Sequence, residues 1–311
     1  MADTPAATPK DTTLIILNPH AAGGRAGALW KQLEPLLWER LGELLVVVTQ
    51  HASEVGERLD HAYASGVRRV ISIGGDGTNH ALVNALIAQN QRVPENDRMV
   101  YGSMPIGTGR DWARGIGMPI RSMKESADWI ARAQPTALDI GRMTKDGTDE
   151  YFLNIASAGL GGAVSRIIEK KKTRRPWTFL LSTVQAILTF QPQRLTITLD
   201  GKPWYDDRVF ALVVANGTTF GHGMKIAPHA VPTDGQFDVV LVRAASRLTI
   251  LAALRRVYDA SHLTHPAVMH ARASQVTVSC KDTFGMELDG EGADGREVSF
   301  SVMPSAMQIL M

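Results

Sequence analysis

A short glycine-rich stretch, residues 74–78, constrains the fold of this chain more than any other part of the sequence. It follows the apolar run 70–73 and precedes the helix-like stretch 81–87, so we expect a strand, a tight turn and a helix. Gly74, Gly75 and Gly77 leave little side chain over the turn, which lets backbone N–H groups approach an anion closely. The helix N-terminus adds partial positive charge. The turn predicts a phosphate site, or alternatively a tight structural connection without a ligand.

An acidic side chain within this turn favours a particular kind of phosphate ligand. Asp76 follows Gly75, and a carboxylate beside a phosphate needs a divalent cation or a hydrogen-bond donor to offset its charge. This pattern predicts a Mg-nucleotide complex.

The first part of the chain alternates between strand-like and helix-like segments. Strands are predicted at 14–17, 44–48 and 70–73, and helices at about 26–41 and 53–65. The strand segments are continuously apolar, which is typical of a parallel sheet covered by helices on both faces. Ligands of such sheets bind at the carboxyl ends of the strands.

A second glycine turn follows the next predicted strand, residues 99–104. Gly107 and Gly109 flank Thr108, so two turns from neighbouring strands could bind one polyphosphate. Neither turn matches a known nucleotide fingerprint. There is no Walker loop, and Trp112 occupies the last glycine position of the dinucleotide pattern.

The pattern changes near residue 138 to short strands with turn pairs such as Asp146 with Gly147 and Asp200 with Gly201. Helices are predicted at about 163–170, 177–190 and 246–258. We therefore predict an α/β domain at 1–135 and a mainly β domain at 136–311.

Composition narrows the class of protein further. The formal net charge of +2 is too small to indicate a nucleic-acid partner. The single cysteine, Cys280, excludes an intrachain disulfide and a cysteine metal cluster. The N-terminus lacks a basic, then apolar, leader pattern, and no apolar run approaches the ~18 residues of a membrane span. We expect a cytoplasmic protein.

Motifs spread along nearly the whole chain resemble those of the bacterial diacylglycerol kinase-like lipid kinases, a group related to sphingosine and ceramide kinases. They are Asn18 and Pro19 with Gly23 and Gly24, residues 74–78, residues 105–114, residues 139–141, Asn154 with residues 157–161, residues 216–228, and residues 288–291. The turn at 74–78 alone is shared with NAD kinases, whereas the ordered combination is specific to the lipid-kinase group. The resemblance implies a nucleotide-binding α/β domain, a C-terminal β-sandwich, and ATP-dependent phosphorylation of a lipid hydroxyl in the cleft between them.

The resemblance also implies roles for individual residues. The implied nucleotide contacts are Thr49, Gly74, Gly75, Asp76, Gly77, Thr78, Asn79, His80, Gly107 and Thr108. Glu291 resembles the proton acceptor, and Asp139 and Asp76 resemble carboxylates that work with it through Mg²⁺ and water. Asp111, in the stretch 105–114, is a further candidate catalytic residue. Spacing alone favours a solvated hairpin-turn residue at Glu291, and only the resemblance favours the catalytic role.

The stretch 226–236 resembles a second metal site of the family, made of one aspartate side chain and two main-chain carbonyls. Here these are Asp234, Val231 and Gln236, and oxygen ligation of this kind suits Mg²⁺. The alternative is an Asp-Gly turn without metal.

Three residues depart from the family pattern. Ala81 replaces the usual glutamate, Arg110 the usual asparagine, and His222 interrupts a glycine run. The Arg110 guanidinium could add a phosphate contact or crowd the nucleotide. A lone histidine such as His222 is more typical of a surface or packing residue than of a metal ligand.

A basic run before the predicted helix 177–190 indicates how a lipid substrate could be reached. The residues are Lys170, Lys171, Lys172, Arg174, Arg175 and Trp177. Clustered cations with a tryptophan favour an anionic membrane surface; a solvated charge run before a core helix is the alternative.

We therefore predict a lipid kinase that uses ATP and Mg²⁺ and acts on diacylglycerol, phosphatidylglycerol or a related lipid. The alternatives are a soluble kinase of the NAD-kinase type and a non-catalytic nucleotide- or lipid-binding relative.

Overall fold

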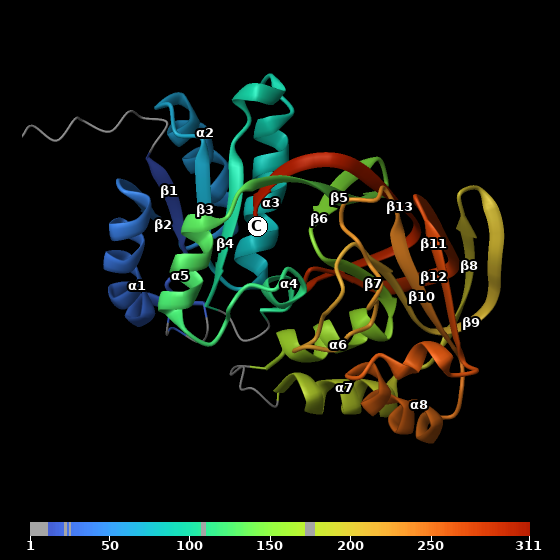
Figure 1. Cartoon of the computed structure of the whole chain (residues 1–311). Helices are drawn as coiled ribbons and strands as arrows, with labels where there is room; N and C mark the ends of the chain where they lie inside the picture. The colour runs from blue at the N-terminus through green and yellow to red at the C-terminus, as the bar shows by residue number, and fades with distance from the viewer. Residues whose placement is uncertain (1–11, 22–23, 25, 107–109, 172–177) are drawn as a thin grey trace, which may run out of the picture. The chain divides into compact units, whose positions relative to one another are not determined.

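The chain forms two compact units. The computed structural model describes residues 12–21, 24, 26–106, 110–171 and 178–311 (Figure 1). Unit 1 contains the described residues up to Leu138 together with Ala306–Met311, and unit 2 is Asp139–Ser305. The last residues of the chain join unit 1 through backbone hydrogen bonds: Gln134 N–H donates to Met311 O at 2.8 Å and Met311 N–H to Gln134 O at 3.2 Å. The predicted division at residue 135 had assigned residues 306–311 to the second domain.

Unit 1 is built on a parallel sheet with the order β2 (Leu44–Val48), β1 (Thr13–Leu17), β3 (Arg69–Gly74) and β4 (Val100–Pro105). The end of β13 (Glu291–Leu310) extends it, since Ile309 pairs in parallel with Tyr101. Parallel pairing places the carboxyl ends of β1 to β4 at one edge of the sheet, as the alternating sequence pattern predicts.

Helices cover both faces of this sheet (Figure 1). On one face, α1 (Ala26–Leu41) and α5 (Met123–Arg132) pack on Ile15 and Leu17 of β1. The alternate residues Leu14 and Ile16, also fully buried, point to the opposite face, where α2 (Val55–Ala64) and α3 (Asp76–Asn90) pack together. The predicted α/β fold of this half is confirmed.

Unit 2 is mainly antiparallel sheet, which confirms the predicted β character. Its main strand order is β11, β10, β9, β7, β12 and β13; β5 pairs with β13 and β6, and β8 pairs with β12 and β9. The bounds are β5 (Pro135–Lys145), β6 (Thr148–Phe152), β7 (Ile155–Gly159), β8 (Gln193–Leu199), β9 (Lys202–Ala215), β10 (Phe237–Arg243), β11 (Val268–Ala273) and β12 (Gln275–Leu288).

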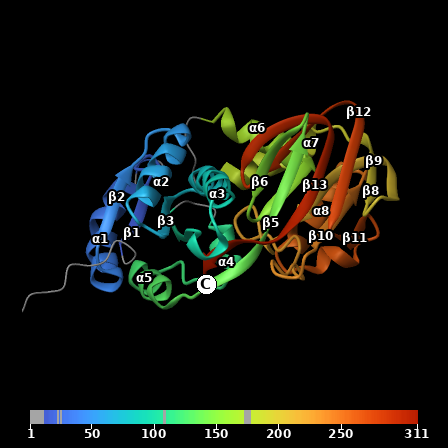
Figure 2. The ribbon, with the colours of Figure 1, turned by 90° about the horizontal axis from the view of Figure 1, so that it is seen from above.

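A tight turn joins the two strands of each hairpin that the sequence predicts. These hairpins are β5–β6 and β8–β9, and Figure 2 shows them from above. Asp146 and Gly147 have φ of 50° and 74°, and Asp200 and Gly201 have φ of 48° and 76°. Positive φ at both central residues is the geometry that Asp-Gly pairs favour in two-residue hairpins.

Three longer helices accompany the sheet of unit 2: α6 (Leu160–Glu169), α7 (Thr178–Thr189) and α8 (Arg247–Leu254). Helix α8 is shorter than predicted because residues Arg255–Val257 continue as a 3-10 turn. The close packing of α6 on β12 depends on Gly162. A Cβ added there would lie 2.4 Å from the carbonyl carbon of Gly285 and 2.5 Å from the nitrogen of Met286.

Gly162→Ala is therefore expected to destabilise the protein by about 2 kcal/mol or more, because a backbone atom cannot move aside as a side chain can. Gly56 of α2 is the matched control, since a Cβ there meets nothing within 4 Å. Gly56→Ala is expected to stabilise by about 0.5 kcal/mol through helix propensity. Urea unfolding measures both changes, and equal stability of the two variants would contradict the prediction.

Candidate functional site

The polar residues of unit 1 gather where its parallel strands end. Asn18 follows β1, Thr49 follows β2, and Gly74 ends β3. Thr49 is buried, and its N–H donates to Leu17 O at 2.9 Å. The carboxyl edge of the sheet is thus the place where a ligand of this domain would bind.

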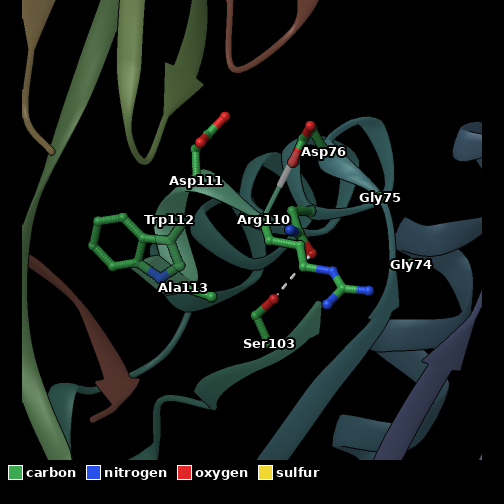
Figure 3. A pocket seen from close by; sticks show the side chains of 9 residues that line it. Gly74, Gly75, Asp76, Ser103, Arg110, Asp111, Trp112 and Ala113 are labelled. Atoms are coloured by element: carbon green, nitrogen blue, oxygen red, sulfur yellow. Dashed lines mark hydrogen bonds between the residues drawn. The ribbon is translucent and has the colours of Figure 1, made fainter. Parts of the chain in front are cut away.

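Side chains from β3, from β4 and from the residue after β1 fix the glycine turn. Asn18 Nδ2 donates to Thr78 Oγ1 at 3.1 Å. Asn79 Oδ1 accepts from Ser72 Oγ of β3 at 2.7 Å. It also accepts from Ser103 Oγ of β4 at 3.4 Å, and Figure 3 labels Ser103. These hydrogen bonds hold the start of α3 against the ends of β1, β3 and β4, so the turn has a defined shape before any ligand arrives.

A pocket opens beside this turn (Figure 3). It is lined by Gly74, Gly75, Asp76, Asn79, Ser103, Arg110, Asp111, Trp112 and Ala113. Gly75 is the N-cap of α3 and supplies no capping side chain. A Cβ at Gly75 would meet no atom within 4 Å. The pocket therefore combines open space with a helix N-terminus, an arrangement that accepts phosphate groups.

Arg110 adds a cation to this pocket. It has a left-handed backbone, with φ 57°, immediately before the short helix α4 (Asp111–Gly115). Its guanidinium extends past the turn on the side of Gly74 (Figure 3) and donates from Nη1 to Ile120 O. Asp111 is buried and forms an ion pair with Arg114, Oδ1 to Nη1 3.0 Å. The Arg110 charge near a glycine turn favours an anionic ligand.

The predicted nucleotide residues fall into three groups. Those that line the pocket are Gly74, Gly75, Asp76 and Asn79. Thr49, Gly77, Thr78 and His80 lie at the same sheet edge or in the first turns of α3 without lining it. Gly107 and Thr108 lie outside the described residues. Ser72 and Ser103 were missed; a serine near the end of an otherwise apolar strand was the available signal.

Asp139 of unit 2 is buried, and both its carboxylate oxygens accept backbone hydrogen bonds. Gly235 N–H donates to Oδ2 at 2.7 Å and Ser305 N–H to Oδ1 at 2.9 Å. The Asp139 carbonyl also accepts from Asn216 Nδ2 at 2.9 Å. These contacts fix the side chain firmly and give it a structural task, while its implied part in catalysis stays a prediction.

Glu291 is exposed at the first position of β13, directly after a two-residue hairpin turn. The turn residues Asp289 and Gly290 have φ of 47° and 96°. The Asp289 carboxylate accepts three backbone N–H groups, from Leu153 at 2.6 Å, Asn154 at 3.0 Å and Ile155 at 2.9 Å. Asp289 thereby sets the position of the turn that presents Glu291, a role that the sequence pattern did not reveal.

The loop predicted to hold a second Mg²⁺ has an arginine beside its one carboxylate, and its metal role stays a prediction. Asp234 Oδ2 accepts from Arg272 Nη2, and Asp234 Oδ1 accepts from Gln236 N–H at 3.0 Å. The Val231 carbonyl accepts from Thr233 N–H at 2.8 Å. A guanidinium already neutralises the one carboxylate of the set, and its positive charge would repel a metal ion at the same oxygen. The sequence missed this because Arg272 is distant along the chain.

Three further observations concern possible metal ligands, the His222 ring and membrane-spanning helices. Within the described ranges, no group of three His, Cys, Asp or Glu side chains is arranged to hold a metal ion. The His222 ring packs at 5.2 Å from that of Phe179. No helix in the part of the chain that the structure describes is long and apolar enough to cross a bilayer.

Comparison with known proteins identifies both parts of the chain. Residues 12–143 match the diacylglycerol kinase catalytic domain, and residues 154–311 match the YegS C-terminal NAD kinase beta sandwich-like domain. The chain belongs to the diacylglycerol kinase-like lipid kinase family. The predicted family and two-part fold class are confirmed.

Individual relatives cover almost the whole chain. A diacylglycerol kinase of Bacillus subtilis (strain 168) is 26% identical over 283 residues, which is 89% of this chain and 88% of the relative. A diacylglycerol kinase of Mycobacterium tuberculosis (strain CDC 1551 / Oshkosh) is 26% identical over 304 residues, which is 95% of this chain and 93% of the relative. A crystal structure of a diacylglycerol kinase from Bacillus anthracis str. Sterne shares the fold with a TM-score of 0.71 at 19% identity, covering 96% of each chain.

Proposed function

We propose that this chain transfers the γ-phosphoryl group of ATP, with Mg²⁺, to the hydroxyl of a lipid such as diacylglycerol, phosphatidylglycerol or a related lipid. The observation that carries the proposal is the pocket of unit 1, where the uncapped N-terminus of α3, the open face of Gly75 and Arg110 occur together. Backbone donors and a guanidinium are the groups that stabilise charge on a transferring phosphoryl group.

Bound Mg²⁺ would neutralise charge on the phosphates, and Asp76 is the residue of unit 1 placed to act beside it. Asp76 is the first residue of α3 and lines the pocket. An alkyl hydroxyl is a poor nucleophile near neutral pH, so a positioned carboxylate must take its proton. We assign that task to Glu291, which is exposed next to a rigidly held turn. The proposal requires that the Glu291 carboxylate and the γ-phosphate approach the same lipid hydroxyl.

Gly75→Ala tests the phosphate pocket. The backbone φ of −101° suits alanine, and the new methyl meets no atom, so the variant should fold with unchanged thermal stability. The methyl occupies the space that the phosphates need, and the KM for ATP should rise about tenfold or more. Steady-state kinetics at saturating lipid measure the change. An unchanged KM would remove this pocket from the nucleotide site.

Glu291→Ala tests the proton acceptor. We expect the rate with γ-labelled ATP and micellar lipids to fall by about 10²- to 10⁴-fold, while ATP binding persists. Glu297, also exposed on β13, provides the matched control, and Glu297→Ala should keep full activity.

The same assay decides between substrates and between classes of protein. A panel of diacylglycerol, phosphatidylglycerol, other lipids and NAD identifies the acceptor. Label in NAD alone would assign the chain to the NAD-kinase type of reaction. ATP binding without label in any acceptor would support a non-catalytic relative, with Arg110 as the first residue to exchange for asparagine.

For access to the lipid we propose reversible docking on an anionic membrane surface. Helix α7 lies beside α8 (Figure 1). Helix α7 exposes Leu180, Leu181 and Leu188 by 46%, 55% and 49%, and α8 exposes Leu248 by 79%. Lys170 and Lys171 lie at the end of α6. The remaining residues of the predicted basic run, Lys172, Arg174, Arg175 and Trp177, lie outside the described residues. Apolar side chains beside cations favour an anionic lipid interface.

The double variant Leu181→Glu with Leu188→Glu is expected to lower co-sedimentation with phosphatidylglycerol-containing vesicles about tenfold or more, because two exposed apolar side chains that would enter the lipid surface become negatively charged. Activity toward a short-chain, water-soluble lipid should stay unchanged. Trp38→Glu, at a residue that is 61% exposed on α1, serves as the control and should bind vesicles normally. Equal loss in both variants would contradict a docking role for α7.

A further inference from the structure

Arg272 of β11 lies between two aspartates of unit 2. Its Nη2 donates to Asp234 Oδ2, and its Nε lies 3.8 Å from Asp238 Oδ2. Asp238 is directly opposite Arg272 in the β10–β11 ladder, and only 1% of it is exposed. Its other oxygen lies 2.6 Å from His270 Nε2. A carboxylate so far removed from water needs a compensating charge close by.

The loop before β10 is closed around the same contact. Gln236 N–H donates to Asp234 Oδ1 at 3.0 Å, and Thr233 N–H donates to the Val231 carbonyl at 2.8 Å. The second Asp234 oxygen is the one that meets Arg272. Backbone N–H groups of the loop therefore satisfy Asp234 Oδ1 and the Val231 carbonyl, and the second Asp234 oxygen is paired with the guanidinium. Mg²⁺ requires a near-octahedral set of oxygen ligands, and among Val231, Asp234 and Gln236 the one carboxylate is already paired with the Arg272 guanidinium.

We propose that Arg272 is the built-in cation of the loop 231–236, so that this part of the fold is held by a side chain and needs no divalent metal. A tethered cation is present at every Mg²⁺ concentration, whereas a bound ion leaves when its concentration falls below its dissociation constant. This inference does not depend on the proposed reaction.

The loop that Arg272 contacts is also hydrogen-bonded to Asp139. Gly235, next to Asp234, donates its N–H to Asp139 Oδ2 at 2.7 Å, and Asp139 N–H donates to Pro232 O at 2.9 Å. Arg272 thus acts as a positioning residue: it fixes Asp234, the loop holds its shape, and the loop fixes the Asp139 side chain.

The test is the thermal stability of the full chain without nucleotide, in EDTA and in millimolar MgCl₂. The wild type and Asp234→Asn should each have the same Tm in both buffers. Arg272→Ala should lower the Tm in EDTA by about 5 °C, because two carboxylates lose their counter-charge. In this variant MgCl₂ should restore part of the loss, and adding Asp234→Asn should abolish that rescue.

Arg194→Ala is the matched control. This variant removes another cross-strand ion pair, between Arg194 and Asp206. The Arg194 side chain is 68% exposed and the Asp206 side chain is 51% exposed, so the Tm should change little. A wild-type Tm that rises with MgCl₂ and loses the rise in Asp234→Asn would overturn the proposal. A Tm of Arg272→Ala as high as that of Arg194→Ala would also overturn the proposal. If Arg272→Ala does not fold, the Tm values of the wild type and of Asp234→Asn in EDTA and in MgCl₂ still test the proposal.

Discussion

The placement of the glycine turn at the carboxyl edge of a parallel sheet is the constraint on which the candidate site depends. Asn18 just after β1, Ser72 of β3 and Ser103 of β4 form hydrogen bonds with Thr78 and Asn79 in the first turn of α3. Ordering a turn with so many glycines costs much conformational entropy, and these hydrogen bonds offset part of that cost. Because neighbouring strands supply the hydrogen bonds, the turn can stay free of bulky side chains and still be rigid enough to receive a phosphate group.

Three aspartates of unit 2 organise backbone through their carboxylates. Asp139 accepts two backbone N–H groups, and Asp289 accepts three. Asp200 does the same in the β8–β9 turn, where Ser274 and Gln275 donate their N–H groups to Oδ1. Charge-assisted hydrogen bonds of this kind are stronger than neutral ones. An aspartate that belongs to a family motif can therefore owe its position to folding, with the exposed Glu291 carried by the turn that Asp289 fixes.

The ion pair between Arg272 and Asp234 shows how one distant residue changes the chemistry of a local motif. The stretch 226–236 has the residues of a magnesium loop when it is considered alone. In the folded chain the Asp234 carboxylate instead accepts from the Arg272 guanidinium and from Gln236 N–H of its own loop. Arginine suits this position because its charge is permanent and its planar donors match a carboxylate.

The sequence by itself determined the alternation of strands and helices in the first half, the Asp-Gly hairpins at 146–147 and 200–201, and the glycine turn, because each follows from local periodicity or from φ values that few residues adopt. Family membership also followed from ordered motifs. Only the tertiary structure decided which residues surround the turn, that residues 306–311 join unit 1 with Ile309 paired to Tyr101 of β4, and that Arg272 meets Asp234. These contacts join residues far apart in the chain, and strand pairing, which local sequence patterns do not encode, brings them together.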